Sequence, residues 1–145
     1  GQGLSTAPSP DGPLFKRVFI GHSGDGGRTW TGLRPLETKD GTALLEFGEC
    51  HGQLIQVPDG RVILVHDRRY PYDQSEIRAR VSHDDGLTWE PDVYHLTDGM
   101  GYPASVALED GTIVTVTGNS WLDERGVEGD LAGSAQAVRW RLRDA

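Results

Sequence analysis

Short apolar runs rich in β-branched residues, separated by turn-forming residues, recur along this chain and predict β-strands. In each of the segments 52–66 and 103–117, two such runs flank an Asp-Gly pair, which begins at Asp59 in the first segment and at Asp110 in the second. Asp-Gly between two apolar runs is the strongest short-range signal for a β-hairpin. Because these runs are apolar on both faces, we expect their strands to be buried between neighbouring sheets.

Two further runs, 77–81 and 138–142, alternate strictly between apolar residues and arginines. Strict alternation predicts a strand with one buried face, because successive side chains point to opposite faces of a sheet. We expect the arginines of both runs to form a solvated sheet surface. No segment shows the periodicity of an amphipathic helix.

The pattern Ser-x-Asp-x-Gly-x-Thr-Trp occurs twice, at residues 23–30 and 82–89, which we call the first and second Ser/Asp turns. Ser and Asp side chains accept hydrogen bonds from nearby backbone N–H groups, and Gly adopts a positive φ without a clash. The closing tryptophan offers a large apolar surface. The pattern therefore predicts two tight turns, each with its tryptophan, Trp30 or Trp89, packed on the sheet.

The order of these elements describes a unit of four antiparallel strands that is used more than once: hairpin, third strand, Ser/Asp turn, fourth strand. Repetition of such units is typical of propeller blades. We expect an all-β chain that forms a partial β-propeller of about two and a half blades, and the C-terminal part of a larger protein whose remaining blades are its partners. The expected blades are the end of one at 16–36, a complete one at 52–96 and an incomplete one at 103–145.

Charge and composition exclude several classes of function. The net charge of −8 argues against nucleic acid or an anionic membrane surface as a partner, because both require clustered positive charge. No apolar run reaches the length of a membrane span, so no membrane insertion is predicted. Cys50 is the only cysteine, which excludes a disulfide within the chain.

The predicted topology indicates where a functional site would lie. The Asp-Gly hairpins and the Ser/Asp turns close the sheets at one end, so the longer connections 67–75, 97–103 and 118–135 meet at the other end. Functional groups concentrate on loops that a rigid scaffold holds in place. Arginines in these loops would bind a carboxylate group through two parallel hydrogen bonds.

The hairpin sequence from Leu54 to Val62, followed by the second Ser/Asp turn, resembles the central blades of bacterial sialidases, in which the Ser/Asp turns are called Asp-boxes or BNR repeats. The likeness covers residues 16–142. It implies a six-bladed sialidase-like propeller, an exo-acting glycoside hydrolase for acidic sugars such as sialic acid, and a secreted or periplasmic location. Asp-boxes also occur in non-catalytic propellers, so the alternative is a propeller that binds glycan or protein without catalysis.

Sialidase chemistry combines an arginine triad for the substrate carboxylate, a tyrosine nucleophile activated by a glutamate, and an acidic aspartate. The glutamate and one arginine of the family pattern fall at His51 and Asp67 of this chain. By resemblance and position, the predicted catalytic residues are Glu49, His51, Asp67 and Tyr70, and the predicted substrate-binding residues are Arg68, Arg69, Asp98, Tyr102 and Trp121. No cofactor and no metal ligand belong to this prediction.

Several roles stay open at the level of sequence. His51 and Asp67 would meet across adjacent strands, where the imidazole serves structure, acid–base catalysis or, with Cys50 and His66 nearby, a metal site. The charged residues after Asp67 either contact a ligand or form a salt-bridged loop. Trp121 either stacks on a sugar or covers the edge of a blade.

Overall fold

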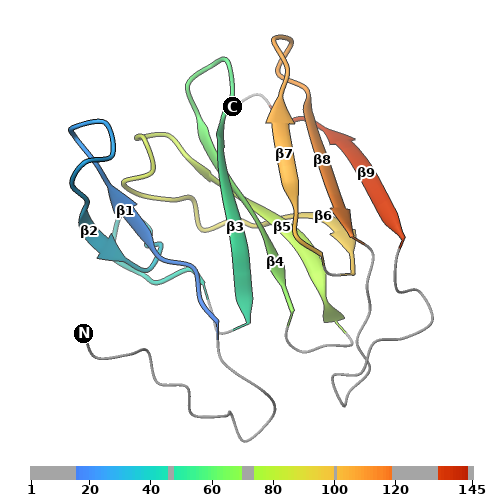
Figure 1. Ribbon diagram of the computed structural model, residues 1–145, viewed down its shortest axis with the longest axis horizontal. Coiled ribbons are helices and arrows are strands. Elements are labelled where there is room, and N and C mark those ends of the chain that lie inside the picture. Colours follow the sequence, from blue (N-terminus) through green and yellow to red (C-terminus); the bar gives the residue numbers. More distant parts are fainter. Residues whose placement is uncertain (1–15, 46–47, 70–73, 100, 119–133, 144–145) are drawn as a thin grey trace, which may run out of the picture.

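Three antiparallel sheets make up the part of the chain that the computed structural model describes, namely residues 16–45, 48–69, 74–99, 101–118 and 134–143 (Figure 1). These residues contain no α-helix, and none of their segments is a helix that could cross a membrane. The prediction of an all-β, antiparallel chain is therefore confirmed. The first sheet comprises β1 (Ile20–His22) and β2 (Thr31–Arg34); the central sheet comprises β3 (Glu49–Gln56), β4 (Val62–Arg68), β5 (Glu76–Ser82) and β6 (Tyr94–Asp98); the third sheet comprises β7 (Ala104–Ala107), β8 (Ile113–Gly118) and β9 (Ala135–Trp140).

Both predicted Asp-Gly hairpins are present, one between β3 and β4 and one between β7 and β8. In the first hairpin, the N–H of Val57 donates to the carbonyl of Arg61 at 3.0 Å. In the second, the N–H of Leu108 donates to the carbonyl of Thr112 at 2.8 Å. The glycine of each pair has a positive φ, 93° at Gly60 and 79° at Gly111, a region that residues with a Cβ rarely occupy. The hairpins therefore owe their geometry to a local signal.

The two Ser/Asp turns share the hydrogen bonds between their Asp and Thr residues. In the second turn, Asp84 Oδ1 accepts from the N–H of Thr88 at 2.8 Å, and its Oδ2 accepts from Thr88 Oγ1 at 2.6 Å. Asp25 and Thr29 repeat both bonds in the first turn at the same distances. The hydroxyl and the backbone N–H of Thr29 together lower the pKa of Asp25 to about 2. The repeated sequence pattern thus encodes one self-contained turn.

The tryptophans of the two turns differ, and the prediction that both are packed is wrong for Trp30. Trp89 is 3% exposed and lies between the central and first sheets, in contact with the apolar cluster that contains Ile20 and Leu36. Trp30 is 68% exposed, and its indole N–H donates to the carbonyl of Gly27 within its own turn. The exposed indole of Trp30 lies over its own turn and beside Gly21 of β1.

The central sheet lies between the other two sheets and is buried on both faces (Figure 1). One face, with Val65 and Ile77, packs against the third sheet at Ile113. The opposite face, with Leu64, packs against Leu45 and the other residues beside the first sheet. The expectation that strands apolar on both faces are buried between sheets is confirmed for β4.

The arginines of β5 are not solvated, contrary to the prediction. Arg80 is 6% exposed and donates to the carbonyl of Leu44 at 2.9 Å, and Arg78 donates to Glu49 Oε1 at 3.0 Å. Because β5 is an inner strand of a sheet covered on both faces, its polar alternate residues must be paired inside the protein. In β9, which is an edge strand, Arg139 is exposed as predicted.

A side-chain amide joins the central sheet to the third sheet. Gln53 Oε1 of β3 accepts from the N–H of Ser105 in β7 at 2.5 Å, and Gln53 Nε2 donates to the Ser105 carbonyl at 3.3 Å. These two bonds satisfy the backbone of an edge strand, as a neighbouring strand would do.

The contrast between the two tryptophans gives a direct test of the packing. Trp89→Ala removes a buried aromatic ring and is expected to lower the free energy of unfolding by about 3–5 kcal/mol. Trp30→Ala is the matched control and is expected to change it by less than about 0.5 kcal/mol, because the ring is largely exposed. Urea unfolding followed by circular dichroism measures both values. Equal effects of the two substitutions would contradict the packing described here.

Candidate functional site

The strand ends opposite the hairpins lie together at one end of the central sheet. Glu49 pairs with Arg68, Arg68 pairs with Glu76, and Glu76 pairs with Asp98 across the four strands. At the other end, Val62 pairs with Ser82, so the hairpin and the second Ser/Asp turn share that end. The predicted division of the sheet into a turn end and a loop end is therefore confirmed.

A β-bulge interrupts β3 at the loop end. Cys50 pairs with Asp67 and Gln53 pairs with Val65, so His51 and Gly52 together lie opposite a single residue of β4. His51 has a φ of 52°, which is uncommon for a residue with a Cβ. A Cβ on Gly52 would lie 2.9 Å from Leu64 Cδ1 and 3.3 Å from Val18 Cγ1, so a larger residue there would require these side chains to shift. The bulge changes the alternation of side chains along β3.

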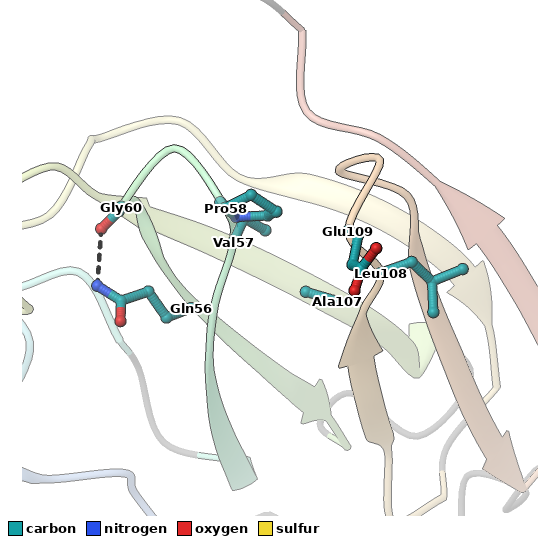
Figure 2. Close-up of a pocket in the computed structure, with 7 residues that line it drawn as sticks. All are labelled: Gln56, Val57, Pro58, Gly60, Ala107, Leu108 and Glu109. Carbon is teal, nitrogen blue, oxygen red and sulfur yellow. Dashed lines mark hydrogen bonds between the residues drawn. The ribbon is translucent and has the colours of Figure 1, made fainter.

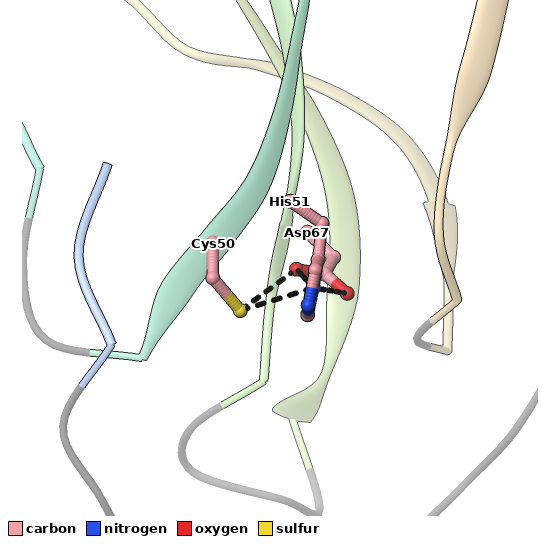
Figure 3. A group of neighbouring side chains, drawn as sticks. All are labelled: Cys50, His51 and Asp67. Atoms are coloured by element: carbon pink, nitrogen blue, oxygen red, sulfur yellow. Dashed lines mark hydrogen bonds and ion pairs between the residues drawn. The ribbon is translucent and has the colours of Figure 1, made fainter. Parts of the chain in front are cut away.

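As a result of the bulge, two neighbouring residues of β3 reach the same carboxylate of β4. Cys50, His51 and Asp67 form what we call the Cys-His-Asp cluster (Figure 3). His51 Nδ1 lies 3.1 Å from Asp67 Oδ1, and Cys50 Sγ lies 3.2 Å from both of these atoms. The Asp67 side chain is fully buried, whereas that of His51 is 20% exposed. The cluster therefore borders solvent through the imidazole.

Arg69 and Tyr102 complete the site on its exposed side. Arg69 Nε donates to Asp67 Oδ2 at 2.9 Å, and its guanidinium carbon lies 5.1 Å from the centre of the Tyr102 ring. The Tyr102 ring in turn meets the His51 ring edge-on, with their centres 4.3 Å apart. Tyr102 is 70% exposed. A cation, an imidazole and an exposed aromatic face thus lie side by side at the loop end.

Glu49 and Arg68 lie on the opposite face of the central sheet. Glu49 is 2% exposed, accepts from Arg78 Nη1 at 3.0 Å and lies 4.0 Å from His66 Nδ1. Arg68 forms an ion pair with Glu76 at 3.5 Å. These residues compensate one another's charge inside the protein, as buried charges require.

The structure brings together four of the predicted site residues and separates three others. Glu49 and Arg68 lie at the predicted loop end but on the face of the central sheet opposite Asp67, because neighbouring residues in a strand point to opposite faces. Asp98 also lies at the loop end, but it is exposed at the end of β6, two strands away from β4, and pairs with His95 at 2.9 Å. Tyr70 and Trp121 lie outside the described residues. The residues brought together are His51, Asp67, Arg69 and Tyr102.

Arg78 contributes to this end of the sheet without having been predicted as a site residue, and Cys50 was named in the sequence only as a neighbour of a possible metal site. Cys50 contacts both His51 and Asp67, and Arg78 holds Glu49. An isolated glycine inside a strand, here Gly52, suggests a β-bulge. A bulge at this point would have indicated that Cys50 and His51 point toward the same partner.

Burial has opposite effects on two titrating groups of this end of the sheet. Burial and the neighbouring Asp67 carboxylate raise the pKa of the Cys50 thiol to about 12. Burial lowers the pKa of His66, against the attraction of Glu49. Both groups are consequently neutral at neutral pH, so Cys50 is not a ready thiolate nucleophile.

The described residues also form an open pocket of about 450 Å³ at the turn end, between the two Asp-Gly hairpins (Figure 2). Its walls are largely backbone and apolar side chains. Gln56 Nε2 donates to the Gly60 carbonyl at 3.1 Å, and Glu109 is the only charged residue of the lining that the structure describes. The hydrogen-bonded His51–Asp67 pair and Arg69 therefore lie at the loop end and not in this pocket.

No family model, curated protein or solved structure matches the chain.

The neutral, buried thiol predicts slow alkylation. With a pKa near 12, Cys50 is expected to react with iodoacetamide at about pH 8 about a thousandfold more slowly in the folded than in the unfolded protein. Asp67→Asn removes a carboxylate that raises this pKa and should accelerate the reaction, whereas Asp85→Asn in an exposed turn should not. Mass spectrometry measures the rates, and circular dichroism verifies that each variant is folded. Equal rates for folded and unfolded protein would refute the assignment.

The buried His66 predicts a loss of stability in acid. Its pKa is lowered on folding, so the unfolded chain binds the proton more readily, and stability decreases as the pH falls below the unfolded-state value of about 6.5. The free energy of unfolding of the wild type minus that of His66→Gln should therefore be smaller at about pH 5.5 than at about pH 7.5. His83→Gln, at an exposed turn position, is the control. A difference that does not change with pH would contradict the prediction.

Proposed function

We propose that this chain is part of a sialidase-like β-propeller whose loop end binds an acidic sugar and supports hydrolysis of its terminal glycosidic bond. The single observation that carries the proposal is the convergence of Arg69, Tyr102 and the hydrogen-bonded His51–Asp67 pair. The functional groups needed to hold a carboxylate, to contact a sugar ring and to move a proton are thereby within reach of one ligand.

The propeller part of the proposal is supported by repetition. The central and third sheets each begin with an Asp-Gly hairpin, and the first and central sheets each carry a Ser/Asp turn with the same hydrogen bonds between Asp and Thr. The three sheets also lie side by side with apolar clusters between them (Figure 1). Such repetition of antiparallel units is what a ring of blades requires.

The recognition part of the proposal depends on Arg69. Asp67 accepts from its Nε and thereby fixes the plane of the guanidinium, so that the terminal N–H groups would be the donors for a sugar carboxylate. Tyr102 offers an exposed aromatic face beside it. An aromatic face next to a fixed cation suits a sugar that has both a ring and a carboxylate.

The catalytic part of the proposal depends on His51. Its ring is partly exposed, and Asp67 holds Nδ1 with both carboxylate oxygens, at 3.1 and 3.2 Å. A carboxylate that orients an imidazole is a recurring arrangement for proton transfer to or from a reacting oxygen. His51 would act as the acid or base in cleavage of the glycosidic bond.

One observation favours the second candidate function, a propeller that binds a glycan without cleaving it. Glu49, the glutamate nearest to the position that activates the nucleophile in sialidases, is buried and ion-paired with Arg78 on the other face of the sheet. A carboxylate held in this way is unable to take a proton from a group beside Arg69, because the sheet lies between them.

Substitution of Arg69 tests recognition. Arg69→Ala is expected to weaken binding of N-acetylneuraminic acid by about 1.5–3 kcal/mol, the value of a charge-assisted hydrogen bond, which is about a 10- to 150-fold increase in Kd. Arg139→Ala, on the exposed edge strand β9, removes the same charge elsewhere and should leave Kd unchanged. Isothermal titration calorimetry measures both. Wild-type protein that binds no acidic sugar, or equal losses in the two variants, would overturn the proposal.

Substitution of His51 separates the two candidate functions. Asparagine tolerates the positive φ at this position, so His51→Asn preserves the backbone and removes the proton-transferring imidazole. On a 4-methylumbelliferyl sialoside, we expect kcat to fall by about 100-fold or more while KM changes little. Sugar binding without any hydrolysis by the wild type would establish the second candidate in place of the first.

A further inference from the structure

The Cys-His-Asp cluster has the composition of a transition-metal site. It combines a thiol, an imidazole nitrogen and a carboxylate oxygen, which are the three donor types that Zn²⁺ takes from proteins. A sulfur donor excludes the hard cations Mg²⁺ and Ca²⁺, which prefer oxygen. We propose that Cys50 Sγ, His51 Nδ1 and Asp67 Oδ1 bind one Zn²⁺ ion, with a fourth position open toward solvent.

The spacing of the three donor atoms supports this inference. They form a nearly equilateral triangle with sides of 3.1, 3.2 and 3.2 Å. A tetrahedral Zn²⁺ ion with bonds of about 2.0–2.3 Å holds its ligands about 3.3–3.6 Å apart. Each side of the triangle therefore needs to widen by only a few tenths of an ångström, which side-chain rotation supplies without movement of the strands.

The backbone is arranged to bring these donors together. Cys50 and His51 are adjacent in sequence and would point to opposite faces in a regular strand. The bulge, with its positive φ at His51 and its closely packed Gly52, turns both toward Asp67. Unfavourable backbone conformations persist where the surrounding structure holds them, and they are concentrated at functional sites.

The surroundings of the cluster meet two further requirements of a metal site. Arg69 Nε binds Asp67 Oδ2 and so orients the carboxylate with Oδ1 toward the other two donors, which is the role of an outer-shell partner. The partly exposed His51 ring, beside the largely exposed Tyr102, gives the ion a path from solvent.

Charge also balances at the proposed site. The thiol of Cys50 loses its proton to solvent when the Zn–S bond forms, and no oxidant or reductant takes part. The thiolate and the Asp67 carboxylate then carry two negative charges against the two positive charges of the ion. His66, which the sequence placed near this cluster, faces Glu49 on the other side of the sheet and is not a ligand.

Zinc at this site would occupy His51 Nδ1 and so remove the imidazole from its hydrogen bond with Asp67. The inference does not depend on the proposed sugar chemistry, because metal binding is measured without any sugar. If both proposals are correct, added Zn²⁺ inhibits hydrolysis; if only the metal site is correct, binding of the metal persists without any hydrolysis to inhibit.

Titration of the 145-residue chain with Co²⁺, after dialysis against a chelator, tests the inference. We expect one Co²⁺ per chain, a thiolate-to-cobalt charge-transfer band and visible bands of tetrahedral intensity, all abolished by one equivalent of Zn²⁺. Cys50→Ser should lose the charge-transfer band. His51→Asn and Asp67→Asn should each weaken Co²⁺ binding by more than about 100-fold, the upper end of what loss of an outer-shell partner costs.

His83→Asn is the matched control, because it makes the same change at an exposed histidine that lies in the second Ser/Asp turn. It should leave Co²⁺ binding unchanged. X-ray absorption of the zinc-loaded wild type gives a result that does not depend on the folding of any variant, and we expect one sulfur among nitrogen and oxygen ligands. The inference is overturned if Co²⁺ fails to bind stoichiometrically, if Cys50→Ser leaves the spectrum unchanged, or if the zinc shell lacks sulfur.

Discussion

Burial of β4 on both faces is the constraint on which the rest of the described structure depends. Its consecutive residues Ile63, Leu64 and Val65 are all buried, and they alternate between the cluster beside the third sheet and the cluster beside the first sheet. One strand thus carries apolar side chains for two interfaces at once. The free energy of this burial fixes the register of the strand, because a slip of one residue would exchange the two faces.

The same alternation continues beyond the apolar part of β4 and distributes its polar residues. Asp67 follows the direction of Val65 toward the third sheet, whereas His66 and Arg68 follow Leu64 toward the first sheet. Since both faces are covered, each carboxylate needs a partner. Arg69 serves Asp67, and Arg78 serves Glu49. The loop end therefore has two separate ion pairs, Arg69–Asp67 on one face of the central sheet and Arg78–Glu49 on the other.

The hairpins, the Ser/Asp turns and the loop end of the sheet could be predicted from the sequence because the physics that forms them is local. A turn depends on Gly60 adopting a positive φ or on Asp84 accepting from Thr88, and neither depends on distant residues. The meeting of His51 with Asp67 also followed from strand order. The burial of Glu49 did not follow, because the isolated Gly52 suggests a bulge but does not show which residues of β3 it turns. Arg68 lies on the face opposite Asp67 because β4 alternates regularly.

Which side chains are buried was less predictable from the sequence than the positions of the strands and turns, for a related reason. Whether Arg80 or Trp30 meets solvent depends on which sheet covers it, and an alternating pattern indicates only that two faces differ. An arginine paired with backbone carbonyls in a protein interior has the same sequence signature as one on a wet surface. The pattern therefore identified the strand correctly and its environment incorrectly.

The amide of Gln53 has a consequence for the loop end, because it ties the central sheet to the third sheet. Gln53 lies two residues after His51 on β3, and Ser105 lies three residues after Tyr102. Both the oxygen and the nitrogen of the Gln53 amide form hydrogen bonds with the backbone of Ser105. His51 and Asp67 belong to the central sheet, whereas Tyr102 directly precedes the first strand of the third sheet, so the Gln53 side chain ties together the two sheets from which the cluster and Tyr102 come. A change in the length of the side chain at position 53 would therefore alter how the rings of His51 and Tyr102 meet, while leaving both rings in place.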